Sequence, residues 1–420
     1  LATLALLGDL AVNLKPELET RNSKLETFLM CLVHFIGGAF KHHPEELSDR
    51  VSVRAQDLIK RAFDNIDPAR LVDHHTHIAG IGTNPSGAFI NPKMRSWAHP
   101  FHHLKFKVYL SAAGVADVAH ADAQLVNRLV NLVKHVANHG KHRLLAFDKN
   151  YRPDGTPNLE KTEFYVPNDY VFELAEQYPE LFVPTISVNP YRTDALEELE
   201  RCARRGARML KWLPNAMGIN PADPLCDRFY QKMKELDLVL LSHGGEEKAV
   251  EADEDQKLGN PLLLRRALDH GVKVIVAHCA GLGENEDLDD PDKKRIPNFD
   301  LFMRLVNERR YDGLVFGDIS AMPQFNRAGK PLATILEQEA LHERLVNGSD
   351  YPLPAINVLI RTGPLVKAGY INSDERNSLN EIYDYNPLLF DFVLKRTMRL
   401  PGTTRRLPAS VFMTNLMLGA

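Results

Sequence analysis

The stretch Leu-Val-Asp-His-His-Thr-His-Ile, residues 71–78, places three histidines within four positions of what otherwise reads as a buried strand. Imidazole is a poor core filler, because each ring carries a donor and an acceptor that must be satisfied. Side chains alternate along a strand, so His75 and His77 are expected on one face and His74 on the other. Asp73 is expected on the face of His75 and His77, one layer deeper, where it could hold an imidazole in its metal-binding tautomer.

Beyond this stretch, short apolar runs alternate with amphipathic helical patterns along most of the chain. Eight runs read as strands: residues 69–78, 142–150, 181–190, 207–215, 238–247, 272–281, 313–322 and 344–354. Each is followed by a segment with apolar residues at helical spacing. Eight such units predict a (β/α)8 TIM barrel, and the near-continuous apolar character of the runs suits parallel strands buried on both faces.

A doubly wound open sheet is the structural alternative. It predicts a glycine-rich phosphate turn after the first strand. Residues 79–87 contain three glycines, but they do not have the GxGxxG spacing. The barrel is therefore favoured.

The segments outside the eightfold alternation give three further expectations. Residues 1–68 form an N-terminal helical extension, 69–395 form the barrel, and 396–420 form a C-terminal tail. The connection from 79 to 141 is long enough to hold extra structure, and residues 92–110 look like a lid or accessory helix over the barrel mouth. His99, His102 and His103 lie in this connection, where they either face the mouth or are solvated.

Composition limits the classes of function. The chain has 420 residues, 44% hydrophobic and 25% charged, with a formal net charge of −4. This is ordinary for a soluble globular protein and gives no global basic field for nucleic acid. The four cysteines form no CxxC pair, which favours a reducing, cytoplasmic location. A homo-oligomer is left open.

The apolar start of the chain bears on membrane association. Residues 1–13 are too short to span a bilayer and are expected to form an amphipathic helix, with peripheral membrane association left open. The chain begins with Leu1, which predicts a preceding segment outside this sequence.

Polar side chains collect at the carboxyl ends of the predicted strands, where a barrel carries its catalytic groups. Each follows an apolar run and precedes a loop. Imidazoles from several strands together with a carboxylate form a ligand set for a divalent transition metal, most simply zinc. Any one of these histidines alone would be read as a hydrogen-bonded core residue, but together they are hard to bury without a metal. The candidate ligands are His75, His77, Lys211, His243, His278 and Asp350.

These residues, in this order over strands 1, 4, 5, 6 and 8, resemble the amidohydrolase superfamily of metal-dependent TIM-barrel enzymes. Asn-Gly-Ser-Asp-Tyr-Pro, residues 347–352, looks like the strand-8 motif of the amidohydrolase-related branch, which includes lactonases and nonoxidative decarboxylases as well as hydrolases. The resemblance covers roughly residues 69–395.

The resemblance implies a role for each ligand. His75 and His77 would bind the more buried metal together with Asp350, and His243 would be a further ligand. His278 would either bind a second metal or polarise the substrate. Lys211 occupies the position at which binuclear members carry a carbamylated lysine that bridges two ions. A lysine paired with a carboxylate at the rim is the alternative, so one or two metals remain open.

The implied chemistry is hydrolysis of an amide, ester or lactone of a small substrate. A bound divalent metal lowers the pKa of its water toward about 7 and polarises a carbonyl, and Asp350 and His278 are the predicted catalytic groups. Decarboxylation by the same site is the alternative, and a barrel that binds metal or a partner without turnover is the third. A carboxylate-bearing substrate would suit basic residues near the mouth. The predicted substrate contacts are Lys149, Arg152, Arg192, Trp212, Asn215 and Glu246, and each has surface solvation as its alternative.

Overall fold

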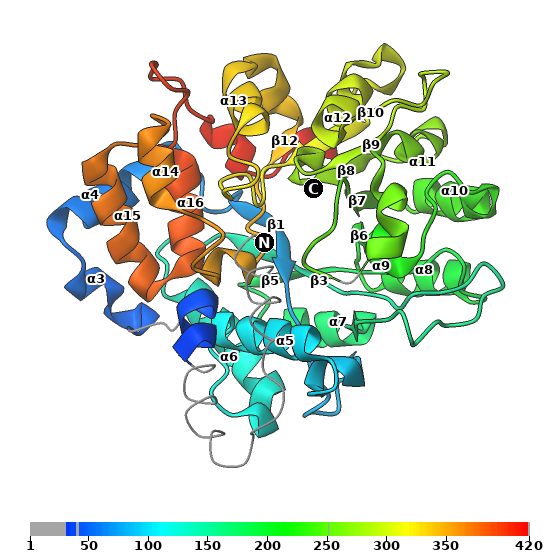
Figure 1. The fold of residues 1–420 in the computed structure, drawn as a ribbon, viewed down its shortest axis with the longest axis horizontal. Helices are drawn as coiled ribbons and strands as arrows, with labels where there is room; N and C mark the ends of the chain where they lie inside the picture. Colours follow the sequence, from blue (N-terminus) through cyan, green and yellow to red (C-terminus); the bar gives the residue numbers. More distant parts are fainter. Residues whose placement is uncertain (1–30, 39–41, 251, 419–420) are drawn as a thin grey trace, which may run out of the picture.

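Eight parallel strands form the centre of the molecule in the computed structural model, which describes residues 31–38, 42–250 and 252–418 (Figure 1). Each of the eight predicted runs overlaps one of these strands. The strands are β1 (Val72–His77), β3 (Lys141–Leu145), β5 (Phe182–Thr185), β6 (Met209–Trp212), β7 (Val239–His243), β8 (Val274–Ala277), β11 (Val315–Asp318) and β12 (Leu345–Val346).

These strands close on themselves. Regular ladders give the orders β1-β3-β5 and β12-β11-β8-β7-β6. Parallel bridges join the two groups, from Ile186 to Leu210 on one side and from Thr76 to Tyr351 on the other. On the second side the Asp350 amide donates to the His75 carbonyl at 2.7 Å. The closed order confirms the predicted (β/α)8 barrel and excludes an open sheet.

Helices surround the barrel (Figure 1). In α8 (Ala195–Arg204) the buried residues Ala195, Leu199 and Cys202 recur at helical spacing, and the remaining face carries arginine and glutamate. The surrounding helices are α6 (Ala121–Lys134), α7 (Asn168–Gln177), α8 (Ala195–Arg204), α9 (Pro214–Met217), α10 (Asp227–Glu235), α11 (Arg265–Asp269), α12 (Asn298–Asn307), α13 (Lys330–Glu337), α14 (Thr362–Lys367), α15 (Ser373–Tyr385) and α16 (Pro387–Thr397).

Two apolar layers fill the fold. The larger lies between the strands and the helices. The smaller fills the barrel and draws on alternating positions of the strands, such as Val239 and Leu241 on β7. Leu418 joins this inner cluster from the short 3-10 helix Leu416–Leu418.

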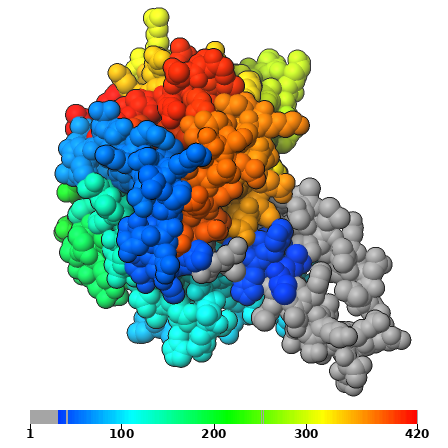
Figure 2. All heavy atoms as spheres, turned by 90° about the vertical axis from the view of Figure 1, so that its left-hand side faces the viewer, coloured from blue at the N-terminus to red at the C-terminus, as the bar shows by residue number. Residues whose placement is uncertain are grey.

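The chain before β1 packs on the chain after β12. Helix α4 (Val53–Ala62), which follows α3 (Leu47–Arg50), lies beside α15 and α16, in line with the adjoining blue and orange surfaces of Figure 2. The Ser52 amide donates to Glu381 at 2.8 Å, and the Arg396 guanidinium donates to the Ala62 carbonyl at 2.9 Å. The division into extension, barrel and tail stays a prediction, and the helix predicted over residues 1–13 lies outside the described residues.

The long connection after β1 contains the predicted extra structure. Strand β2 (Phe89–Ile90) pairs antiparallel with β4 (Phe164–Tyr165), which belongs to the connection after β3. Helix α5 (Pro100–Ala112) follows β2. Among the described residues, none of the helices combines the length and apolar character that crossing a bilayer requires.

Candidate active site

Two histidines of β1 and the aspartate after β12 converge at the carboxyl end of the barrel. His75 Nε2 lies 3.2 Å from His77 Nε2, and each of these nitrogens lies 3.3 Å from Asp350 Oδ1. Ligand atoms about 2.1 Å from one tetrahedral ion would lie about 3.4 Å apart. The three donor atoms therefore have the spacing and chemistry of ligands to one divalent cation.

The buried carboxylate of Asp318, at the end of β11, orients His75. Its Oδ2 lies 2.8 Å from His75 Nδ1, which places the proton on Nδ1 and leaves the Nε2 lone pair toward Asp350. Burial alone would raise the pKa of Asp318, but the electrostatic interaction and hydrogen bond with His75 hold it well below its usual range. Asp318 was not selected from the sequence. Its position within the predicted strand 313–322 was the feature of the sequence that could have placed it near the other strand-end residues.

The orienting role predicted for Asp73 is wrong. The pairing of β1 with β3 shifts register between Asp73 and Thr76, so alternation does not carry Asp73 onto the face of His75. Its Oδ1 instead accepts from the His75 and Ser349 amides at 2.9 and 3.0 Å, and its Oδ2 lies 3.4 Å from His142 Nδ1. Asp73 thus stabilises the backbone at His75 and Ser349, beside the site.

Lys211, from the end of β6, reaches the same point. Its Nζ lies 3.2 Å from His75 Nε2, and its side chain is fully buried. Burial lowers the pKa of Lys211 to about 8. A substantial neutral fraction near physiological pH is what reaction with carbon dioxide requires.

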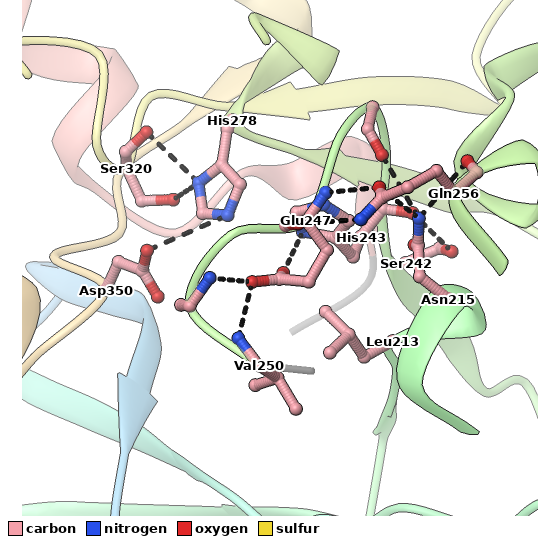
Figure 3. A network of polar contacts seen from close by, with 12 residues as sticks. Leu213, Asn215, Ser242, His243, Glu247, Val250, Gln256, His278, Ser320 and Asp350 are labelled. Carbon is pink, nitrogen blue, oxygen red and sulfur yellow. Dashed lines mark hydrogen bonds and ion pairs between the residues drawn. The ribbon is translucent and has the colours of Figure 1, made fainter. Parts of the chain in front are cut away.

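Two further histidines extend the cluster: His278 lies beside Asp350, and His243 lies beside His278 (Figure 3). His278 Nδ1 lies 2.7 Å from Ser320 Oγ, and its Nε2 lies 3.7 Å from Asp350 Oδ2. The His243 ring centroid is 5.3 Å from that of His278. His243 Nδ1 faces Glu247 at 3.5 Å, and its buried Nε2 has no hydrogen-bond partner among the described residues.

The imidazoles of His243 and His278 are both neutral at physiological pH, as metal ligands must be. Burial lowers the pKa of His243 to about 4 and that of His278 well below its ordinary value. His278 also has a φ of +55°, in the left-handed region that non-glycine residues rarely adopt. Asp350 shares this feature with a φ of +59°. Such backbone conformations concentrate at functional sites.

The cluster forms the floor of a cavity with an empty volume of about 1050 Å³, including the space at its mouth. Helix α5 covers part of it with Phe106, Tyr109 and Leu110, which confirms the predicted accessory helix over the mouth. His99, His102 and His103 are not among its lining residues, and the buried His103 ring packs against Trp97 with centroids 4.2 Å apart.

None of the six predicted substrate contacts lines this cavity. Three of them are basic. Lys149 lies over the Tyr165 ring, and Arg192 pairs with Asp148 and Asp194, whereas Arg152 is exposed. Their positions after the strands are as expected, but loop geometry turns the side chains away.

The other three predicted contacts also have different partners. Trp212 is fully buried against α10, with Nε1 donating to the Val188 carbonyl at 2.8 Å. Asn215 is buried behind the loop after β7 and contacts Gln256 (Figure 3). Glu246 pairs with Lys248. The neighbouring Glu247 lines the cavity instead, together with Glu163 and Tyr109.

Solved structures with a similar fold share little sequence with this chain. An uncharacterized TIM-barrel protein from Bordetella bronchiseptica is 13% identical, with a TM-score of 0.47 and coverage of 74% of this chain and 94% of that one. A 5-carboxyvanillate decarboxylase from Novosphingobium aromaticivorans, complexed with manganese and a nitrobenzoic acid, is 12% identical (TM-score 0.42; 76% and 93%). A 4-oxalomesaconate hydratase from Rhodopseudomonas palustris is 13% identical (TM-score 0.39; 74% and 88%). No curated protein matched the chain.

A family model matches just under half of the chain. Residues 153–356 match the model described as amidohydrolase, and this region carries Lys211, His243, His278, Asp318 and Asp350. His75 and His77 precede the matched region but meet its residues in the folded barrel. The family and the histidine–aspartate cluster together support catalysis that depends on a divalent metal. Over residues 153–356 the chain is therefore similar to the amidohydrolase family.

Proposed function

We propose that this protein is a hydrolase that cleaves an ester, lactone or amide bond with the help of a divalent metal, most simply zinc. The observation that carries the proposal is the convergence of His75, His77 and Asp350 on one point at the floor of a largely apolar cavity. Two of these groups are imidazoles, which suit zinc and neighbouring transition metals.

His75, His77 and Asp350 would hold the ion, and His243 Nε2 is free to contribute on the cavity side. A divalent ion bound there supplies an activated water and polarises the substrate carbonyl. In a single-metal site, Lys211 and His278 would lie beside this ion, whereas in a two-metal site they would help to hold a second ion.

Asp350 is proposed to move the proton. Burial raises its pKa, but the neighbouring His278, His75 and His77 lower it more strongly, so that the carboxylate is ionised at physiological pH. An ionised carboxylate at the floor of the cavity can accept a proton from water and deliver it to the leaving group. His278, held by Ser320, faces the same carboxylate from the opposite side and is positioned to polarise the substrate.

Nonoxidative decarboxylation is the alternative reaction. Its substrate carries a carboxylate, which the divalent ion could hold, but beyond this ion Lys211 is the only lysine or arginine among the described residues that line the cavity. Glu163 and Glu247 also line it, and their charge would oppose an anionic substrate. The cavity thus favours hydrolysis. A protein that binds metal without turnover is the outcome if both reactions are absent in the metal-loaded state.

The test is metal analysis of the purified protein followed by assays with and without a chelator. We expect bound divalent metal, hydrolysis of simple esters and lactones, and loss of hydrolysis on chelation with recovery on metal addition. Release of carbon dioxide from aromatic acids, with no hydrolysis, would replace the proposal with decarboxylation.

The Lys211→Ala variant separates a bridged two-metal site from a single-metal site. If Lys211 is carbamylated, its two oxygens can bridge two ions about 3.5–4 Å apart, with His243 and His278 on the second. We favour this form and expect two ions per chain in the parent and fewer in the variant. An added short carboxylic acid should restore the loss. One ion per chain in both proteins, bound equally tightly, would rule out the bridge.

The Asp318→Asn variant tests the orientation of His75. The amide cannot reproduce the charged acceptor at His75 Nδ1, so the metal affinity should fall roughly 10–100-fold. Competition with a chromogenic chelator measures this change. Asp312→Asn, at an exposed site distant from the cluster, is the control. Equal affinity in Asp318→Asn and the parent would show that Asp318 does not tune the ligand.

A further inference from the structure

The walls of the cavity differ sharply in character from its floor. Above the titratable cluster, the lining is almost entirely aliphatic or aromatic and comes from several parts of the chain. It includes Ile81 and Met94 from the connection after β1, Phe147 after β3 and Leu213 after β6. Pockets that bind small molecules commonly combine apolar walls with a few polar groups that fix orientation.

We infer that the site takes an uncharged, largely apolar carbonyl compound, with its alkyl or aromatic part held between α5 and the barrel mouth. The inference rests on the proposed function only for the position of the reacting bond. It sets aside the carboxylate-bearing substrate that the sequence suggested, because Lys149, Arg152 and Arg192 do not line the cavity.

Helix α5 is held firmly enough to serve as a wall. One side presents Phe106 and Leu110 to the cavity. Another side packs Val108 and Ala112 against a separate apolar cluster that includes Ile36. Because both sides are buried, the helix cannot leave the mouth without exposing apolar surface.

A hydroxyl contact extends this wall across the opening. Tyr109 donates to the Ala249 carbonyl at 3.1 Å and so links α5 to the loop after β7. The next residue, Val250, contributes its side chain to the cavity lining. Apolar surface therefore continues from α5 to the loop.

Besides Asp350 at the floor, the lining has two carboxylates, Glu163 and Glu247, and both already have partners. Glu163 pairs with Lys105 at 2.7 Å. Glu247 accepts from the Ala249 and Val250 amides and faces His243. An anionic ligand in the cavity would lie close to these carboxylates. The described lining contains no lysine or arginine besides Lys211 to offset that repulsion. A cation would compete with contacts already made, so a neutral ligand fits best.

Binding of two fluorescent probes of nearly equal shape tests the inference without turnover. N-phenyl-1-naphthylamine is neutral, and 8-anilino-1-naphthalenesulfonate is the same framework with a negative charge. Titrated into the full chain, the neutral probe should bind at least about tenfold more tightly, because the sulfonate must be desolvated near two carboxylates.

Variants that fill the cavity locate the bound probe. Ala113→Phe, at the end of α5, and Val250→Trp, in the partly exposed loop after β7, both add bulk to lining positions. Each should weaken binding of the neutral probe by roughly tenfold or more. Phe101→Ala changes an exposed aromatic residue of the same helix and should leave binding and activity unchanged. Circular dichroism checks that each variant is folded, and the loop variant decides the result if Ala113→Phe does not fold.

An ester series with lengthening unbranched acyl chains connects binding to the reaction. We expect kcat/KM to rise about threefold to fourfold per added methylene until the cavity is full. Tighter binding of the sulfonate, or neutral-probe binding that neither filling variant weakens, would overturn the inference. Cavity-dependent binding of the neutral probe without hydrolysis of any ester, lactone or amide would instead overturn the proposed reaction and leave the apolar site standing.

Discussion

Replacing His75 and His77 together with alanine should remove the bound metal and lower kcat/KM by about a thousandfold or more. The two Nε2 atoms and Asp350 Oδ1 form one compact ligand group, so the double variant keeps only a single member of it. Asp350, even with His243, would hold this ion too weakly to retain it against water and buffer. Metal content by elemental analysis and hydrolysis by a continuous ester assay give two independent measurements.

The control for this variant is a histidine outside the cluster. His135 is exposed at the end of α6, and His135→Ala should retain both metal and activity. Near-ultraviolet circular dichroism distinguishes loss of the site from loss of the fold. Full metal occupancy in the folded double variant would refute the proposed ligand set.

Replacing Lys395 with methionine should destabilise the protein by about 3–5 kcal/mol, because it leaves the Asp391 carboxylate buried without its cation. Both residues lie on α16 with almost no solvent exposure, and Lys395 Nζ also donates to the Gly348 carbonyl at 2.6 Å. Gly348 lies two residues before Asp350, so the same pair supports the loop that presents the carboxylate to the site. Urea-induced unfolding measures the free energy change.

Two comparisons test the assignment of this loss to an unpaired buried charge. The double variant Asp391→Leu/Lys395→Met removes both charges and should be more stable than Lys395→Met alone. Arg54→Met breaks an exposed pair with Asp374 and should change stability little. If the double variant is less stable than Lys395→Met, the loss has another origin.

The same pair predicts a dependence on pH. Burial raises the pKa of Asp391 against the opposing effect of Lys395, and loss of Lys395 should raise it further. A carboxyl whose pKa is raised by folding binds more protons in the folded state, so its contribution to stability falls as pH rises. The deficit of Lys395→Met should therefore be larger at about pH 9 than at about pH 6.

The pattern of residues along the chain was enough to establish the barrel and the identity of most residues at its floor. Eight apolar runs separated by helical patterns require parallel strands, and parallel strands in a closed barrel bring their carboxyl ends together. The polar residues that end strands 1, 4, 5, 6 and 8 consequently meet, whatever the detailed packing. The position of each residue at the end of a predicted strand was sufficient to predict that His75, His77, Lys211, His278 and Asp350 would lie close together.

What surrounds that floor depends on contacts that form only in the folded protein. A register shift between β1 and β3 removed Asp73 from the face of His75, and Asp318 from β11 took the orienting role. Loop side chains followed their own hydrogen bonds, so Glu247 lines the cavity and Glu246 does not. Likewise α5 reaches the mouth only through packing with residues distant in sequence, such as Ala355. Strand alternation and element order are local and repetitive, whereas loop orientation, register shifts and buried pairs depend on contacts between segments that the sequence pattern does not connect.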